Sequence, residues 1–250
     1  MIIIIFFISH WYLSLFSQTF LQHRYASHGA FTMNKFWERF FYIFAYFTQG
    51  STYLSPRTYA IMHRMHHAYA DTPKDPHSQK YFSSFFSLMM HTTRMFENIY
   101  DKKVEIEERF TRNLPDWPWM DKWGKSLTNR IIFSLLYIGF YIFFDAQLWM
   151  YALLPIQIFM SPIQGTIINW FAHKYGRINF KVNNSSKNLI PVDVFMLGED
   201  YHNNHHKFPS SANFGVKWYE IDPVFYIMRV FNWLKIIKIK NMGTYVSSEF

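Results

Sequence analysis

The sequence predicts an all-α integral membrane protein whose histidine-rich segments gather at one face of the bilayer. Of its 250 residues, 50% are hydrophobic, 22% are aromatic and only 17% are charged. Two stretches, residues 1–22 and 131–172, carry almost no charge, and an apolar helix of about 20 residues is enough to cross a bilayer. Nine of the 12 histidines form three clusters and one isolated position, all outside these stretches.

Residues 1–22 are predicted to form the first spanning helix. The opening MIIIIFFISHWYLSLF lacks the basic n-region and the A-x-A-like cleavage site of a secretory signal. All 25 Lys and Arg residues, beginning with Arg24, lie outside the two apolar stretches. Because cytoplasmic segments carry the excess of Lys and Arg, the face that bears the histidines is predicted to be cytoplasmic.

Residues 36–54 are predicted to form a re-entrant or interfacial helix. The uninterrupted apolar core, from Phe40 to Phe47, is too short to cross a bilayer. A single crossing would also place His23 and His63 in opposite compartments, where they could not share a metal site.

Residues 131–172 are predicted to form a transmembrane hairpin. Their roughly 42 residues suffice for two crossings of about 20 residues each, with a short turn near Asp145 on the far side. Pro155 and Pro162 are expected to kink the second helix, since proline removes a backbone hydrogen bond. The hairpin returns the chain to the face that it left, so that His173 rejoins the other histidines.

Residues 173–250 are predicted to form a cytoplasmic C-terminal region, within a single domain that covers residues 1–250. The segment PVFYIMRVFNWLKIIKIK mixes large apolar residues with Arg and Lys, which is typical of a helix lying on an anionic membrane surface. The charged loop 97–130 is expected to be a cytoplasmic excursion. The net charge of +8 is explained mainly by topology and by attraction to lipid.

The histidine clusters indicate a site for two metal ions. The clusters are HRYASH, HRMHH and HNNHH, and His173 stands alone. Neutral imidazole is the commonest metal ligand. In the pattern H-x-x-H-H on a helix, three rings fall within about 100° of arc. His23 and His28 are five residues apart, about 140° around an α-helix, so they need a helix end or a π-bulge to converge.

The ligand types favour an oxidative site. The sequence contains no cysteine, which excludes thiolate ligands, and imidazole alone suits zinc, copper and iron. A hydrolytic two-metal site normally includes bridging carboxylates, which the clusters lack. Two irons could instead use dioxygen to attack a C–H bond, and the apolar, aromatic chain suits an alkyl substrate. His10, His77 and His91 are expected to be packed or solvated side chains.

Three stretches resemble the histidine boxes of the membrane-bound fatty acyl-CoA desaturases, the group that includes stearoyl-CoA desaturase. They are HRYASH, HRMHHAYADTPKDPHS and GEDYHNNHHKFP, accompanied by Asn169-x-x-x-His173. The resemblance runs from residue 10 to residue 235. With one apolar stretch ahead of His23, the chain is most similar to the compact bacterial members. The resemblance implies a helical membrane protein with a cytoplasmic histidine-box catalytic region.

The resemblance also implies an oxidoreductase with two iron ions per chain. It would introduce a cis double bond into a long-chain fatty acyl thioester, with acyl-CoA as the expected carrier and delta-9 as the expected position, while O₂ is reduced to water. A small cytochrome or ferredoxin with its reductase is expected to supply electrons, because the sequence has no flavin, haem or cysteine motif. Membrane lipid is an expected partner, nucleic acid is not, and the expected location is a bacterial inner membrane with the active site facing the cytoplasm. Overexpressed protein is expected to take up zinc, because imidazole sites bind Zn²⁺ more tightly than Fe²⁺.

Individual residues receive roles in the same way. By resemblance, one iron would be bound by His23, His28, His63, His67 and His206. The other would be bound by His66, His173, His202 and His205, with Asn169 reaching it through water. The nearby carboxylates expected to orient the rings are Asp71, Asp75, Glu199 and Asp200. The basic residues closest to the boxes, expected to contact the acyl carrier, are Arg24, Arg57, Arg64 and Lys74.

Two other functions remain open at the level of sequence. A di-iron membrane hydroxylase of the alkane, sterol or carotenoid kind would use similar boxes, although the four residues between His23 and His28 and the extra ligand His173 favour a desaturase. A membrane metal transporter would place its polar ligands within the spans, whereas these clusters flank them.

Overall fold

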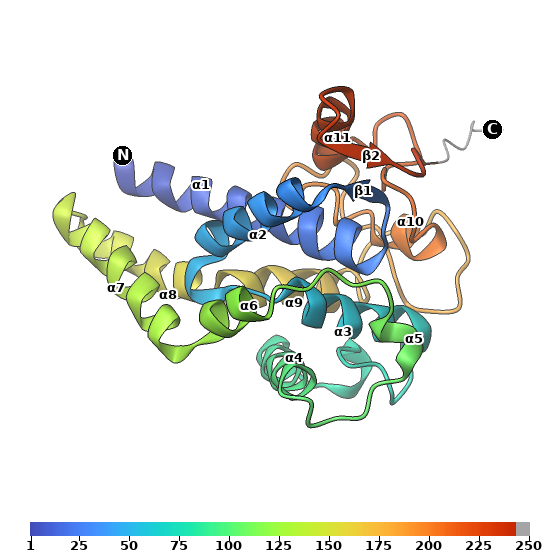
Figure 1. The fold of residues 1–250 in the computed structure, drawn as a ribbon, viewed down its shortest axis with the longest axis horizontal. Coiled ribbons are helices and arrows are strands. Elements are labelled where there is room, and N and C mark those ends of the chain that lie inside the picture. The colour runs from blue at the N-terminus through green and yellow to red at the C-terminus, as the bar shows by residue number, and fades with distance from the viewer. Residues whose placement is uncertain (244–250) are drawn as a thin grey trace.

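Helices make up almost all of the regular structure in residues 1–243, the part of the chain that the computed structural model describes (Figure 1). The α-helices are α1 (Ile2–Ser17), α2 (Lys35–Gln49), α3 (Pro56–Tyr69), α4 (Phe85–Tyr100), α5 (Glu108–Thr111), α6 (Pro118–Lys125), α7 (Leu127–Phe143), α8 (Leu154–Ile158), α9 (Met160–Phe171), α10 (His202–Lys207) and α11 (Pro223–Trp233). The other elements are the π-helix η1 (Gln18–Ser27), the 3₁₀ helices η2 (Gly50–Thr52), η3 (Gln79–Tyr81) and η4 (Leu148–Leu153), and the strands β1 (Phe31–Met33) and β2 (Ile237–Ile239). The predicted all-α class is confirmed, since β1 and β2 form one short antiparallel pair. Residues 244–250 of the predicted C-terminal region lie outside the described residues.

The first candidate span is longer than the sequence predicted. α1 and η1 form one helix from Ile2 to Ser27, which is long and apolar enough to cross a membrane. Ile5 and Ile8 are exposed on its surface, as expected of side chains that face lipid. The helix does not end at residue 22, because it continues in π-helical form through the first histidine box.

Two bent helix pairs occupy the region of the predicted hairpin. α6 and α7 meet at 58°, and the segment from Leu148 to Ile158 meets α9 at 72°. If each bent pair counts as one span, the described residues contain up to three spans. Between the pairs, the chain turns at the exposed Asp145, whose φ is 48°.

The bend between α8 and α9 confirms the kink that the prolines predicted. Pro162 has no N–H to donate to the carbonyl of Ile158, one turn earlier. The Ser51 hydroxyl donates to that carbonyl instead, at 2.8 Å. Because an unpaired carbonyl inside a membrane protein is costly, this contact stabilises the bend and ties η2 to it.

The segment 36–54 takes the course that a re-entrant element requires. α2 packs against α1 and runs back along it, after which η2 and α3 return to the end of η1 (Figure 1). The reversal occurs at Gly50, which has a φ of 50°, and a Cβ atom there would lie 1.9 Å from the Tyr137 hydroxyl. Only glycine fits this turn without strain.

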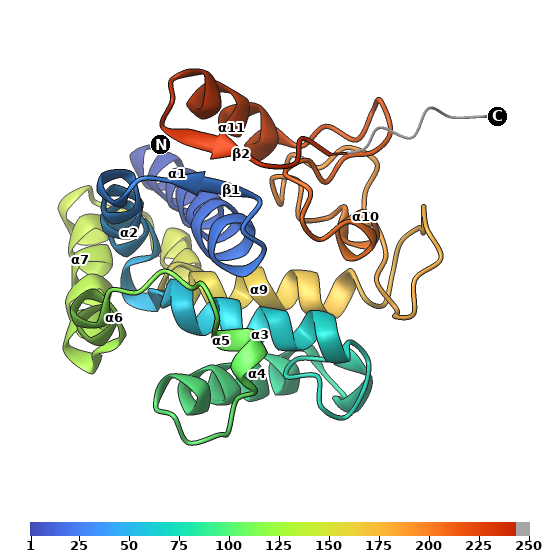
Figure 2. The same cartoon turned by 45° about the vertical axis from the view of Figure 1, so that its right-hand side comes forward.

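The C-terminal helix covers the outer side of the first two helices. α11 buries Phe225 and Met228 in a core shared with Phe20 and Phe41, and it lies beside the β1–β2 pair in Figure 2. Its opposite side exposes apolar residues that include Trp233. This amphipathic arrangement agrees with the predicted position on a membrane surface, which stays a prediction.

Replacing Gly50 with alanine is expected to destabilise the fold by about 1–3 kcal/mol, the usual effect of a backbone conformation that only glycine adopts readily. The measurement is the thermal unfolding midpoint of the purified protein in detergent. Gly139→Ala in α7 is the matched control, because a Cβ there meets nothing within 4 Å. Equal midpoints for Gly50→Ala and the wild type would contradict the role assigned to this turn.

Candidate metal centre

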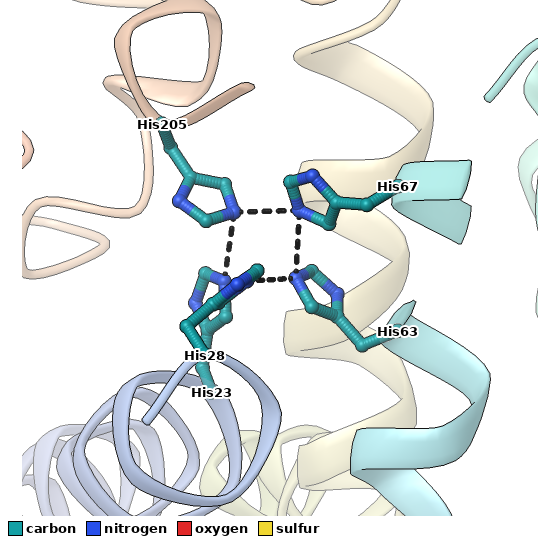
Figure 3. Close-up of side chains that lie close together, drawn as sticks. All are labelled: His23, His28, His63, His67 and His205. Atoms are coloured by element: carbon teal, nitrogen blue, oxygen red, sulfur yellow. Dashed lines mark hydrogen bonds between the residues drawn. The ribbon is translucent and has the colours of Figure 1, made fainter. Parts of the chain in front are cut away.

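The nine predicted histidine ligands converge on two adjacent groups of ring nitrogens. Group one contains His23, His28, His63, His67 and His205 (Figure 3), and group two contains His66, His173, His202 and His206. Within each group, the candidate ligand atoms all lie within 4.8 Å of one another. The structure therefore brings together segments that are up to 183 residues apart (from His23 to His206).

The division between the groups corrects the prediction for two residues. His205, not His206, joins group one, and its Nε2 atom lies 2.8 Å from Nε2 of His67. His206 joins group two, with its Nε2 atom 3.1 Å from Nε2 of His202. Residues four apart on a helix differ by only about 40°, so they point to the same group, while the residue at the third position turns about 60° the other way. The same rule holds in α3, where the groups are exchanged. His63 and His67, four residues apart, share group one, and His66, at the third position, reaches group two.

The π-helix η1 brings the two histidines of the first box together. Its hydrogen bonds join residues five apart, and the N–H of His28 donates to the His23 carbonyl at 3.2 Å. Five residues therefore complete about one turn, and both rings reach group one. The spacing predicted a helix end or a π-bulge, and the structure has a π-helix that ends at Ser27, next to His28.

Buried polar side chains fix the two helices that carry the other boxes. Ser55 caps α3, and its hydroxyl donates to the buried Asp121 carboxylate at 2.7 Å. Asn203 and Asn204 of α10 bond to the surrounding loops, and the Asn204 amide donates to Glu220 at 2.8 Å. A six-residue helix cannot hold its own shape in water, so these bonds position the third box.

The nitrogen geometry of group one fits a metal ion. Four pairs of Nε2 atoms lie 2.8–3.0 Å apart. His23 donates its Nδ1 proton to Glu199, 2.7 Å away, so its Nε2 atom presents a lone pair to the centre. A lone pair held in this direction is available to bind a cation at the centre of group one. Metal–nitrogen bonds of about 2.1 Å at right angles would put the nitrogens about 3.0 Å apart, as observed.

Group two fits a second ion. Its Nε2 separations are 2.9 Å for His173 and His202, 3.1 Å for His202 and His206, and 3.2 Å for His66 and His206. His66 donates Nδ1–H to Asp75 at 3.0 Å, which again leaves the Nε2 lone pair facing inward. Asn169 lies one helical turn before His173 and lines the same cavity as His202, so its predicted contact through water stays a prediction.

The electrostatics keep the rings in the form that binds metal. Burial, followed by the proximity of other imidazoles, lowers the pKa of His63, His67 and His205 well below the usual range. Burial also lowers the pKa of His202 and His206, with the neighbouring rings adding to the effect. Neutral imidazole is the metal-binding form, so these five rings need not lose a proton to bind metal at neutral pH.

Three of the four predicted carboxylates orient ligand rings. Glu199 and Asp75 accept protons directly from His23 and His66. Asp71 acts through one intermediate: it accepts the Ser185 hydroxyl at 2.8 Å, and that oxygen lies 3.1 Å from Nδ1 of His173. Such outer hydrogen bonds fix the tautomer and direction of a ligand ring.

Asp200 does not follow the prediction. It lies beside the Asp193 carboxylate, and burial together with that neighbouring charge raises the pKa of Asp200 to about 8. Its backbone N–H donates to Asp193 at 2.9 Å. The residue follows the inward-facing Glu199, and its side chain turns away from the rings into this carboxyl pair.

The sequence missed two polar residues beside the site. Asn184 Nδ2 lies 3.2 Å from Nδ1 of His206, and Ser185 lies between Asp71 and His173. Both belong to the run NNSS, which is typical of any polar loop. No local pattern could have shown that this loop folds back over the histidines.

The structure argues against the predicted acyl-carrier contact of Arg24, which is fully buried, while the partly buried Arg64 also bonds within the fold. Arg24 is fully buried, forms an ion pair with Asp222 at 2.8 Å and lies over the Phe214 ring. Arg64 donates to the backbone carbonyls of Ala26 and Ser27, at the end of η1. A buried charge needs such partners.

The other two predicted contacts remain nearer the surface. Arg57 is partly buried, and Lys74 is exposed with its Nζ atom 5.5 Å from the centre of the Tyr69 ring. Nothing in the structure tests their contact with a carrier.

Among the histidines expected to be packed, His77 lies next to the site. His10 is buried beside Tyr137, and His91 lies against Phe82. His77 is also buried, but its ring lies 4.4 Å from the His66 ring, and both its nitrogens lack a hydrogen-bond partner among the described residues. It lines the cavity beside group one and group two.

A large apolar cavity extends from the histidines. Its volume is 740 Å³, and it reaches from His23, His63 and His202 to apolar side chains of α4, α7 and α9. Ligand pockets typically measure about 300–1,000 Å³. The arrangement can hold a long alkyl group with one part of it beside the two metal sites.

Comparisons with known proteins agree with this geometry. The sequence profile of the fatty acid desaturase family matches residues 1–232. The chain is 30% identical to "Delta-9 acyl-lipid desaturase 2" of Arabidopsis thaliana over 84% of this chain and 65% of that protein. It is 29% identical to "sn-1 stearoyl-lipid 9-desaturase" of Synechocystis over 86% of this chain and 64% of that protein. The chain thus spans just under two thirds of the length of these relatives.

Pairs of substitutions will show which histidines share an ion. Chains with His23→Ala and His205→Ala together are expected to keep about one metal ion, because both residues serve group one, whereas His23→Ala with His206→Ala should leave almost none. The measurement is metal per chain by elemental analysis of purified protein. His91→Ala is the control and should keep both ions. The opposite pattern for the two double variants would restore the division predicted from sequence.

Proposed function

The chain belongs to the fatty acid desaturase family, and from this premise we propose that it introduces a cis double bond into a long-chain fatty acyl group, with delta-9 as the position. One observation carries the proposal: two groups of converging imidazole nitrogens lie at the head of an apolar cavity of 740 Å³. The names of the relatives agree with desaturation as the reaction and with delta-9 as the position of the double bond.

The proposed reaction is R–CH₂–CH₂–R′ + O₂ + 2e⁻ + 2H⁺ → R–CH=CH–R′ + 2H₂O. Two iron ions, held by group one and group two, would supply the redox chemistry that uses O₂ to remove hydrogen from the two methylenes. The chain itself supplies the ligand lone pairs, which Glu199 and Asp75 direct inward by holding the Nδ1 protons. The apolar walls of the cavity bind the alkyl chain and keep water away from it.

The proposed carrier of the acyl group is a membrane lipid. The sequence led us to expect acyl-CoA, but two of the residues expected to contact the acyl carrier bond elsewhere: Arg24 to Asp222, and Arg64 to backbone carbonyls. The relatives are named as acyl-lipid and stearoyl-lipid enzymes. The two electrons would come from a small cytochrome or ferredoxin with its reductase.

The proposal keeps the predicted single domain over residues 1–250 and a site that faces the cytoplasm at a bacterial inner membrane. The positive charge on the histidine-bearing segments supports that orientation. The membrane itself follows from the family and from the apolar helix Ile2–Ser27.

Expression in a host that lacks its own desaturase tests the activity. The wild-type chain is expected to produce monounsaturated fatty acids, with the double bond located by mass spectrometry of the derivatised lipid. His67→Ala should reduce the new alkene by at least about 100-fold, since loss of a ligand removes the metal-dependent step. His91→Ala, which keeps the ligand set, should retain the activity.

Two other outcomes would replace the proposed activity. Hydroxylated fatty acids without any new alkene would identify a di-iron hydroxylase. Transport of zinc or iron into vesicles by the purified chain, without O₂ consumption, would identify a metal transporter.

A further inference from the structure

We propose that the acyl chain enters the cavity sideways from the bilayer, through an opening between α4 and α7, while it is still attached to a glycerophospholipid. This inference rests on the proposed function and specifies the entrance and the lipid. It concerns a part of the cavity that lies away from the histidines.

The side chains between α4 and α7 mark the mouth of the cavity. Phe86 and Met90 of α4, and Leu127, Ile131 and Leu135 of α7, line the cavity and are nevertheless 50–71% exposed. A side chain that lines the cavity and is also exposed on the surface of the molecule lies at an opening of the cavity. On each helix these residues are four apart, so they form one row along one face.

The mouth faces lipid and not water. Ile131 and Leu135 lie in the apolar half of the bent pair that could form a span, and large exposed apolar side chains on such a helix contact hydrocarbon. Figures 1 and 2 both show α7 leaving the neighbourhood of α4 and running towards the N-terminal end of α1. The opening therefore lies beside the first half of α7, on the side of the membrane that carries the metal centre.

A polar contact at the mouth suits a phospholipid headgroup. Arg130 and Glu97 both line the cavity and form an ion pair of 3.5 Å between α7 and α4, with side chains 42% and 39% exposed. An ion pair this exposed contributes little to stability, so it can open. Arg130 is also the last basic residue before the apolar stretch 131–172, at the depth where lipid phosphates lie.

The entrance would open when Arg130 exchanges its partner Glu97 for a lipid phosphate. A lipid phosphate can replace the Glu97 carboxylate on the Arg130 guanidinium, because both anions offer two oxygens to its planar fork. Inside, the Thr92 hydroxyl is buried on the α4 wall without a partner among the described residues. The Thr92 hydroxyl can donate to an ester carbonyl of the bound lipid. With the ester held there, the apolar acyl chain would extend towards the histidines.

A reversible cross-link can test the entrance, because the chain contains no cysteine of its own. The test variant carries Glu97→Cys and Arg130→Cys, joined by a short bifunctional methanethiosulfonate. The control variant carries Asp101→Cys and Lys125→Cys, which replace an ion pair of 2.6 Å outside the cavity lining. Both full-length proteins are placed in vesicles that contain phosphatidylglycerol with a photoreactive diazirine in the middle of one acyl chain.

Relative to the same double-cysteine variant before cross-linking, the cross-link is expected to reduce the diazirine adducts on cavity residues of α9 by at least ten-fold, and cleavage of the cross-link by a reductant should restore that starting level. Adducts are located and counted by mass spectrometry. The wild type and the cross-linked control should be labelled equally. Ile131→Arg is a second variant at an exposed position, and it should lower the labelling without any cross-link.

The same experiment with a diazirine acyl-CoA provides the competing outcome. Labelling of the cavity by acyl-CoA alone, or labelling by the lipid that is equal with the mouth open and closed, would overturn the inference. Labelling needs no turnover, so it is independent of the proposed activity. Normal lipid labelling without alkene formation would contradict the proposed function but would still support the proposed entrance.

Discussion

Keeping nine imidazole rings within reach of two metal ions is the constraint on which the rest of the structure depends. Their Nε2 atoms lie 2.8–3.2 Å apart, and without metal the contact between any two of them depends on the tautomer of each ring. The fold must therefore hold these rings by other means: a π-helix for His23 and His28, a capped α3, and a six-residue α10 fastened by Asn203 and Asn204. Bound metal would then connect the rings directly.

Charged groups inside the fold serve this site indirectly. Arg24 follows the ligand His23 and ties η1 to Asp222, ahead of α11. Arg64 stands between two ligands of α3 and binds the carbonyls that end η1. Arg24 is fully buried by its contact with Asp222, and Arg64, which is partly buried, links α3 to the end of η1. Loss of Asp222 would leave the buried charge of Arg24 unpaired, which is strongly destabilising.

The membrane imposes the second constraint, because it offers no water to unpaired backbone groups. At the bend between α8 and α9 the Ser51 hydroxyl satisfies the carbonyl that Pro162 leaves free. That bond requires η2 to reach into the helices, which in turn requires the glycine turn at Gly50. The same turn sends α3 back to the end of η1. The reversal of the chain at η2 thus satisfies the bent helix and returns the second histidine box to the first.

The apolar segments, the helical class, the histidine clusters and the need for a helix end or a π-bulge between His23 and His28 could all be predicted, since they follow from local composition and spacing. The tertiary structure alone decided that His205 and His206 serve different groups from those predicted, that Asp200 pairs with Asp193, and that Ser185 connects Asp71 to His173. A local pattern fixes the angle at which a side chain leaves its helix. What that side chain meets depends on segments more than 100 residues away, as in the contact of Asp71 with Ser185.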